Sequence, residues 1–143
     1  MNKQLRMQGN AYYQFINVNP KGKFCGDCVI RAIALACDQS WEQTIRELTE
    51  LGIKKGYELN DKKLYPQYLK EKGFREVPEP RDVNNRKMSV RDWIVQYQVS
   101  DKYVYVMNVG LCHVSCVKNR KVHDTWDCSK NTAHKIWEKG VRR

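Results

Sequence analysis

The chain of 143 residues carries 26 Lys and Arg against 16 Asp and Glu, a formal charge of +10, and 41% of its residues are apolar. This length suffices for one hydrophobic core, and the composition excludes disorder throughout. No stretch reaches the roughly 20 apolar residues of a membrane span, and the N-terminal residues lack the apolar run of a signal peptide. We therefore expect a basic, cytoplasmic protein with a single domain over residues 1–143.

The N-terminal part of the chain is polar and rich in turn-forming residues. Residues 1–16 are expected to be a flexible or edge segment, and "NPKG" at residues 19–22 predicts a turn. The first helix is expected over Cys28–Cys37, where apolar side chains recur on one face. Asp27, directly before it, is a residue type that favours the N-cap position.

Three further helical segments are predicted. A capping box in "SWEQ" starts a helix after Ser40, which should end near Gly52 or Gly56. A shorter helical piece, interrupted at Pro66, lies in "NDKKLYPQYLKEKGF". The segment "VPEPRDVNNRK" is expected to be a loop, and "SVRDWIVQYQ" opens a helix with a second capping box at Ser89.

The C-terminal part of the chain has the periodicity of strands. "KYVYVMNVG" alternates with period two, and "HVSCV" and "KVHDTW" flank the turn "KNR" as in a β-hairpin. The tail "AHKIWEKGVRR" is expected to be a strand or a short helix. This order predicts an α+β fold, in which N-terminal helices pack on a small antiparallel sheet.

One of the six cysteines, Cys28, indicates a candidate catalytic site. In a reducing compartment, six cysteines are expected to be thiols or metal ligands and not a disulfide framework. Cys28 opens the first predicted helix, where exposed backbone N–H groups and the positive helix end favour a thiolate. A nucleophilic thiolate needs an imidazole beside it, and His113 begins a predicted strand. Asp124, across the hairpin, is the nearest carboxylate to orient the ring, with Asp127 as the alternative.

These residues resemble the papain-like cysteine peptidase superfamily. "CGDCV" at residues 25–29 follows the spacing of its Cys-Gly-Ser/Ala-Cys-Trp/Tyr signature, with departures at Asp27 and Val29. "DTW" at residues 124–126 resembles the Asn-Ser-Trp of that family. Residues 17–128 are also similar to small bacterial and phage papain-like proteins, which carry "NPxG…GDCxIRAI" early and "YDTWD" late.

The resemblance implies a compact papain-like fold and a thiol hydrolase that acts on a peptide, isopeptide or other amide and requires no cofactor. By that match Cys28 is the nucleophile, His113 the base and Asp124 the third member of a triad. Trp126 would shelter the hydrogen bond between the histidine and the aspartate.

The chain departs from the family in three respects. Cys28 and His113 are only 85 residues apart (113 − 28), against about 130 in papain. Gly22 occupies the position of the glutamine that donates to the oxyanion, so Asn19 or Asn17 would have to replace it. Asp27 places an anion beside the thiol, which opposes thiolate formation.

Two other functions stay open on sequence grounds. One is a papain-fold binding or inhibitor protein without efficient chemistry, which Gly22 favours. The other is a zinc-stabilised nucleic-acid-binding protein, in which Cys25 and Cys28 form one ligand pair. The remaining zinc ligands would come from Cys112, His113, Cys116 and Cys128.

The partner most consistent with the composition is a peptide or protein. The positive charge favours acidic substrates, nucleic acid is the less favoured partner, and no membrane partner is expected. The sequence does not define the oligomeric state, and for Cys37, Cys116 and Cys128 it indicates no role beyond packing.

Overall fold

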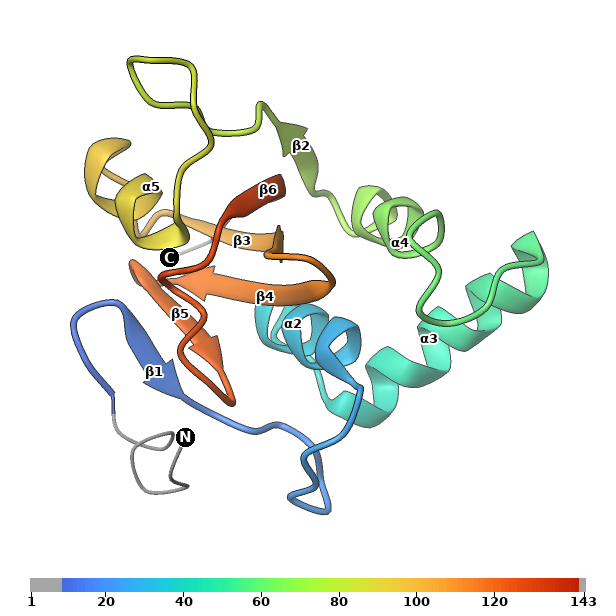
Figure 1. The fold of residues 1–143 in the computed structure, drawn as a ribbon. Coiled ribbons are helices and arrows are strands. Elements are labelled where there is room, and N and C mark those ends of the chain that lie inside the picture. Colours follow the sequence, from blue (N-terminus) through green and yellow to red (C-terminus); the bar gives the residue numbers. More distant parts are fainter. Residues whose placement is uncertain (1–8, 142–143) are drawn as a thin grey trace.

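The computed structural model describes residues 9–141, and Figure 1 shows their arrangement. Over these residues the chain forms four helices and one mixed sheet of six strands, in the order β1-β5-β4-β3-β6-β2. The predicted α+β class is therefore confirmed. The helices are α2 (Cys28–Cys37), α3 (Trp41–Lys55), α4 (Tyr65–Glu71) and α5 (Val90–Gln96). The strands are β1 (Tyr13–Phe15), β2 (Arg75–Val77), β3 (Tyr103–Val109), β4 (His113–Lys118), β5 (Lys121–Asp124) and β6 (Ala133–Gly140).

Helix α2 has the predicted span and is almost entirely buried, because it packs between strand β4 and helix α3. It ends at Asp38, whose backbone adopts the left-handed conformation with φ of 52°. Asp27 occupies the N-cap position, as predicted, but its side chain makes no capping hydrogen bond. The carboxylate instead accepts a hydrogen bond from Arg31, one turn into the helix.

The other helix boundaries follow local signals. Ser40 and Ser89 each accept a hydrogen bond from the backbone N–H three residues later, so both predicted N-caps are confirmed. The expectation that Pro66 interrupts a helix is wrong, because Pro66 lies in the first turn of α4. Proline fits there, since the first N–H groups of a helix have no partner within it.

The sheet is larger than predicted and is not purely antiparallel. β1 lies at one edge and pairs in parallel with β5, so that Tyr13 lies opposite Val122. β2 forms the other edge, antiparallel to β6. Both edge strands are three residues long, too short for their side-chain alternation to be recognised in the sequence. The C-terminal tail is the strand β6.

The predicted hairpin is formed by β4 and β5. Asn119 and Arg120 connect the two strands, and both have positive φ, 51° and 62°. This is the backbone twist of the tight turns that join antiparallel strands. The hairpin aligns Lys118 with Lys121 and thereby brings the start of β4 near the end of β5.

Apolar side chains fill both faces of the sheet. Val104 and Val106 of β3 pack with helices α2, α3 and α4 on one face. The alternate residues Tyr105 and Met107 pack with α5 on the other face, as the period of two requires. Among residues 9–141, no helix is both long and apolar enough to cross a membrane. This packing fixes the N-terminus of α2 against the β4–β5 hairpin (Figure 1).

Candidate active site

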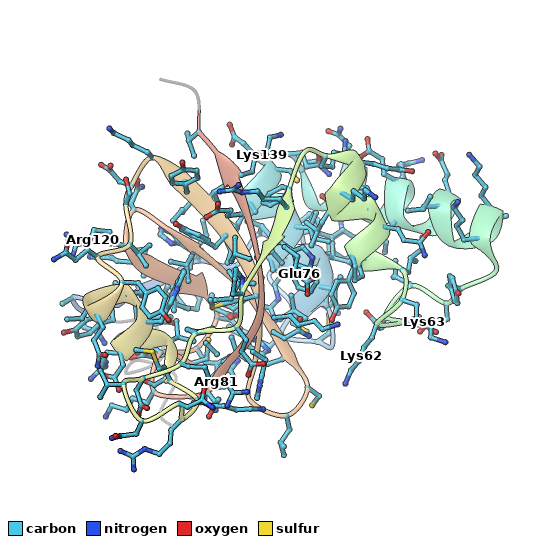
Figure 2. All side chains as sticks on the ribbon, turned by 90° about the horizontal axis from the view of Figure 1, so that it is seen from above. Lys62, Lys63, Glu76, Arg81, Arg120 and Lys139 are labelled. Atoms are coloured by element: carbon cyan, nitrogen blue, oxygen red, sulfur yellow. The ribbon has the colours of Figure 1, made fainter. Side chains whose placement is uncertain are left out.

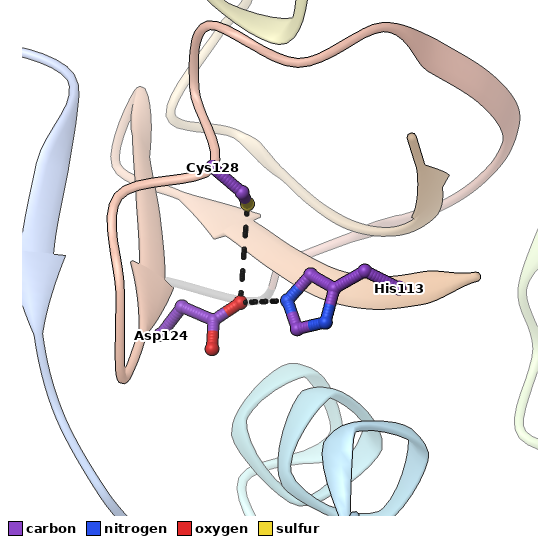
Figure 3. A group of neighbouring side chains, drawn as sticks. All are labelled: His113, Asp124 and Cys128. Carbon is purple, nitrogen blue, oxygen red and sulfur yellow. Dashed lines mark hydrogen bonds and ion pairs between the residues drawn. The ribbon is translucent and has the colours of Figure 1, made fainter. Parts of the chain in front are cut away.

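His113 and Asp124 form a short hydrogen bond across the hairpin. Nε2 of His113 lies 2.6 Å from Oδ2 of Asp124, as Figure 3 shows. The same carboxylate oxygen accepts a bond of 2.6 Å from the hydroxyl of Ser115. Burial disfavours the charged carboxylate, but the bonds from His113 and Ser115 outweigh burial and hold the pKa of Asp124 below its usual value. The carboxylate is thus an anion that fixes the ring.

Cys28 lies beside the same ring, and hydrogen bonding from His113 and from the backbone of Val114 favours the ionised form of its thiol. Burial opposes ionisation of Cys28, yet these two bonds and the positive ring lower the pKa of its thiol.

The pKa of His113 is raised, whereas that of Cys28 is lowered. Burial lowers it, but the hydrogen bonds with Asp124, Cys128 and Cys28 raise it to about 11. A lowered thiol pKa and a raised imidazole pKa both favour the charged pair. Both shifts favour a thiolate at Cys28 paired with an imidazolium at His113, the state in which a cysteine is nucleophilic.

Arg31 connects the two ends of this site, and the sequence analysis did not identify it. Its Nε donates to Oδ1 of Asp27 at 2.7 Å, and its NH1 donates to Oδ1 of Asp124, also at 2.7 Å. All three side chains are buried. The one signal in the sequence was position: Arg31 lies four residues after Asp27, on an otherwise apolar helix.

Asp27 does not act as an isolated anion beside the nucleophile. Besides Arg31, the indole of Trp41 donates to it at 2.9 Å and the amide of Asn19 at 3.2 Å. Burial alone would raise the pKa of Asp27, but these three donors lower it. Because Arg31 balances its charge, the carboxylate opposes the Cys28 thiolate less than the sequence suggests.

Of the other predicted site residues, Trp126 lies against His113 and Asp127 does not bond to it. The ring of Trp126 lies 4.9 Å from that of His113, centroid to centroid, and so covers it. Asp127 is directed elsewhere, since its carboxylate accepts bonds from Asn10 and from the backbone N–H of Ser129. The structure therefore brings Asp124, and not Asp127, to the imidazole.

The two asparagines considered for the oxyanion are used within the loop before α2. Asn17 donates its side-chain amide to the carbonyl of Lys23, and Asn19 donates to Asp27. Gly22 has φ of 65° and closes the turn of residues 19–22, where its backbone N–H donates to the carbonyl of Asn19. These contacts hold the loop that leads into α2.

A pocket of about 270 Å³ opens beside Cys28. Its walls include Tyr65 of α4 and Asn108 of β3, neither of which the sequence analysis singled out. Nδ2 of Asn108 donates to the hydroxyl oxygen of Tyr65 at 2.8 Å. Because that oxygen already accepts a bond, the hydroxyl hydrogen of Tyr65 is available to an acceptor in the pocket.

One group of side chains has the spacing of metal ligands. Ligand atoms of His113, Asp124 and Cys128 lie within 4.8 Å of one another (Figure 3). It is the one such group among residues 9–141, and it contains neither Cys25 nor Cys28. The zinc set considered from the sequence, built on that cysteine pair, is therefore not gathered in the described part of the chain.

Comparisons with models of known protein families, with curated proteins and with solved structures found no match. The class of the protein is therefore that of its fold and chemistry: an α+β protein in which a cysteine at the start of a buried helix lies beside a histidine and an aspartate of the β4–β5 hairpin.

Proposed function

We propose that the protein is a papain-like thiol hydrolase that cleaves a peptide, isopeptide or other amide bond. The observation that carries the proposal is the 2.6 Å hydrogen bond between His113 and Asp124 beside Cys28, whose thiol pKa His113 lowers against the effect of burial. A nucleophile, a base and an orienting carboxylate in contact are the parts that acyl transfer requires.

The reaction follows from the charges of these groups. The thiolate of Cys28 attacks the carbonyl carbon, and the carbonyl oxygen takes up the negative charge. The imidazolium of His113 then gives its proton to the leaving amine, so the C–N bond breaks and a thioester remains. Neutral His113 next takes a proton from water, whose oxygen attacks the thioester carbon; the C–S bond then breaks, which frees the acid and returns Cys28 to its thiolate. Asp124 keeps the ring oriented and stabilises its positive form throughout.

Two donors are available to the negative oxygen. The backbone N–H of Cys28 lies in the first turn of α2, where N–H groups have no partner within the helix. The hydroxyl of Tyr65 lines the same pocket and is close enough to Cys28 to sense its charge. We infer that Tyr65 replaces the missing glutamine. Tyr65→Phe should then lower kcat by about a hundredfold or more and leave substrate binding little changed.

Alkylation of the native protein with iodoacetamide tests the proposal. Cys28 should react faster than Cys25 at neutral pH, and His113→Ala should abolish the difference. Cys25 is the control because it is an exposed cysteine three residues away. Partial desolvation and the nearby charge of Asp27 raise the pKa of its thiol, so it should react slowly. Equal, slow labelling of both thiols would instead support a binding protein that has kept the fold without chemistry.

A structural metal site is the second candidate, because His113, Asp124 and Cys128 could each offer a ligand atom. A metal held there would occupy the ring nitrogen that faces Asp124. In that case Cys28 would be labelled equally with and without His113, and purified protein would release zinc to a chelator. The hydrolase proposal predicts that chelation leaves the labelling rate unchanged.

A further inference from the structure

Two adjoining cavities, together called the groove below, lie beside the nucleophile. The pocket beside Cys28 shares the wall residues Lys62, Tyr65 and Asn108 with a second cavity of about 400 Å³, so the two lie side by side. The second cavity extends between α4 and β6, to Trp137. A side chain of a substrate bound at Cys28 is therefore near enough to reach the residues that line the second cavity.

The walls of this groove are positively charged. Lys62 lines both cavities and Lys135 lines the second, while neither lining contains an aspartate or glutamate. No ion pair joins either lysine to another described residue. By contrast Lys72 is paired with Glu47. The groove thus presents two uncompensated positive charges.

A third basic residue in the groove is already compensated. Nδ1 of His134 lies 3.5 Å from a carboxylate oxygen of Glu79, and Lys87 lies 3.6 Å from the same oxygen. The charge available to a ligand is therefore that of Lys62 and Lys135.

Two other features of the groove suit a peptide. Oδ1 of Asn108 is buried and has no hydrogen-bond partner among the described residues, and a peptide N–H is a donor that would satisfy it. Leu111, 98% exposed, lines the second cavity and offers apolar contact to a side chain. A free inorganic anion would use neither feature.

We propose that the substrate is an acidic peptide, with a carboxylate side chain that binds Lys62 and Lys135 beside the bond presented to Cys28. This specificity rests on the proposed function. Exposed ion pairs of this kind change binding by about threefold each and weaken as salt is raised.

Paired peptide reagents test the specificity. One series carries an N-terminal chloroacetyl group and the other a C-terminal chloromethyl ketone, so the peptide extends to either side of Cys28. Each peptide is made with Glu and with Gln at one position. The Glu form should modify Cys28 about threefold to tenfold faster than its Gln twin, and Lys62→Gln and Lys135→Gln should each reduce that ratio.

Lys63→Gln is the matched control. Lys63 is the next residue, carries the same charge and extends in a different direction from Lys62, as Figure 2 shows, and it lines neither cavity. Equal rates for the Glu and Gln peptides would overturn the inference. An equal loss of preference in Lys63→Gln would do the same, because it would reveal a general effect of net charge.

A binding measurement separates this inference from the proposed function. Fluorescent Glu and Gln peptides without a reactive group are titrated into Cys28→Ala, where no chemistry can occur. Tighter binding of the Glu peptide, lost in Lys135→Gln, supports the subsite even if Cys28 proves unreactive. Equal binding overturns it even if Cys28 is reactive. Displacement by a single-stranded oligonucleotide at lower concentration than by unlabelled Glu peptide would also overturn it and assign the groove to phosphates.

Discussion

Asp124 is the side chain on which the arrangement of the site depends. One oxygen accepts bonds from His113 and Ser115, and the other accepts from Arg31 and from the backbone N–H of Thr125. A carboxylate with this many donors stays ionised despite its burial. It can therefore orient His113 and stabilise the positive charge of the ring at the same time.

Asp124→Asn should uncouple these two effects. The amide can still contact the ring, but it carries no negative charge, so the pKa of His113 falls and the thiolate at Cys28 loses its partner. We expect the rate of Cys28 alkylation at pH 6 to fall about tenfold or more, with circular dichroism unchanged. Asp127→Asn removes a neighbouring carboxylate that does not contact the ring. Equal rates in the two variants would show that Asp124 has no role in ionising the thiol.

At the scale of elements, helix α2 joins the loop before it to the hairpin far along the chain. Arg31 makes this connection, since it pairs with Asp27 at the helix start and with Asp124, 93 residues away. Such a buried ion pair contributes little net stability when intact, but removal of one member leaves the others uncompensated. Arg31 is thus needed both for the fold and for the ionisation of the site.

Arg31→Met keeps the volume of the side chain and removes its charge, which leaves the buried Asp27 without its cation and Asp124 with His113 alone. We expect the free energy of unfolding to fall by about 3–5 kcal/mol, measured by urea denaturation. Arg46→Met, on the exposed face of α3, should change it by less than about 0.5 kcal/mol. A similar small effect of both substitutions would mean that the ion pairs of Arg31 are not important for folding.

One substitution in the hairpin of β4 and β5 should raise the free energy of unfolding. Arg120 is held at φ of 62°, which is unfavourable for residues other than glycine. Arg120→Gly should create the Asn-Gly turn that tight hairpins favour and raise the free energy of unfolding by about 0.5–1 kcal/mol. Lys118→Gly, within strand β4, should lower it. A loss of stability in Arg120→Gly would contradict the assigned turn.

At the scale of the whole molecule, two buried carboxylates make stability depend on pH. Asp27 and Asp124 both have pKa values below their usual range. Burial alone would raise both pKa values, but the hydrogen bond from Arg31 to Asp27 and the hydrogen bond from His113 to Asp124 lower them by more. A lowered pKa stabilises the fold at pH values above the unfolded value, and this stability is lost as pH falls through the folded value.

We therefore expect Tm to change little between pH 7 and 5 and to fall steeply below about pH 4, where carboxylates protonate in the unfolded chain. Thermal unfolding in a series of buffers measures this directly. Asp27→Asn, which cannot titrate, should have a lower Tm at neutral pH and a shallower acid slope. An unchanged slope in this variant would contradict the pKa shift of Asp27.

The sequence predicts those parts of the molecule that local signals specify. Ser40 and Ser89 bond to residues three positions away, and the hairpin needs only a turn between two alternating strands, so each was recognisable. Cys28 and His113 were identified because a helix start and a strand start are both marked locally. Their meeting depends on packing, which the sequence pattern does not specify.

The features that were missed depend on contacts between distant segments. Arg31 on an apolar helix has no visible partner until β5 lies beside it. Strand β1 exists because β5 offers an edge to pair with, and three residues carry too little periodicity to show it. The sequence pattern predicts Tyr65 only as a core residue of a short helix. In the folded protein Tyr65 lines the pocket beside Cys28, near enough for the charge of Cys28 to affect its hydroxyl.

The charge state of Cys28 is the most direct measurement of whether this site is built for catalysis. The ultraviolet absorbance of the thiolate, taken as wild type minus Cys28→Ser, is followed as a function of pH. We predict a thiol that titrates below the ordinary value of about 8.5 and whose pKa rises in His113→Ala. A thiol that titrates at or above about 8.5 in the wild type, unaffected by His113→Ala, would contradict the thiolate–imidazolium pair.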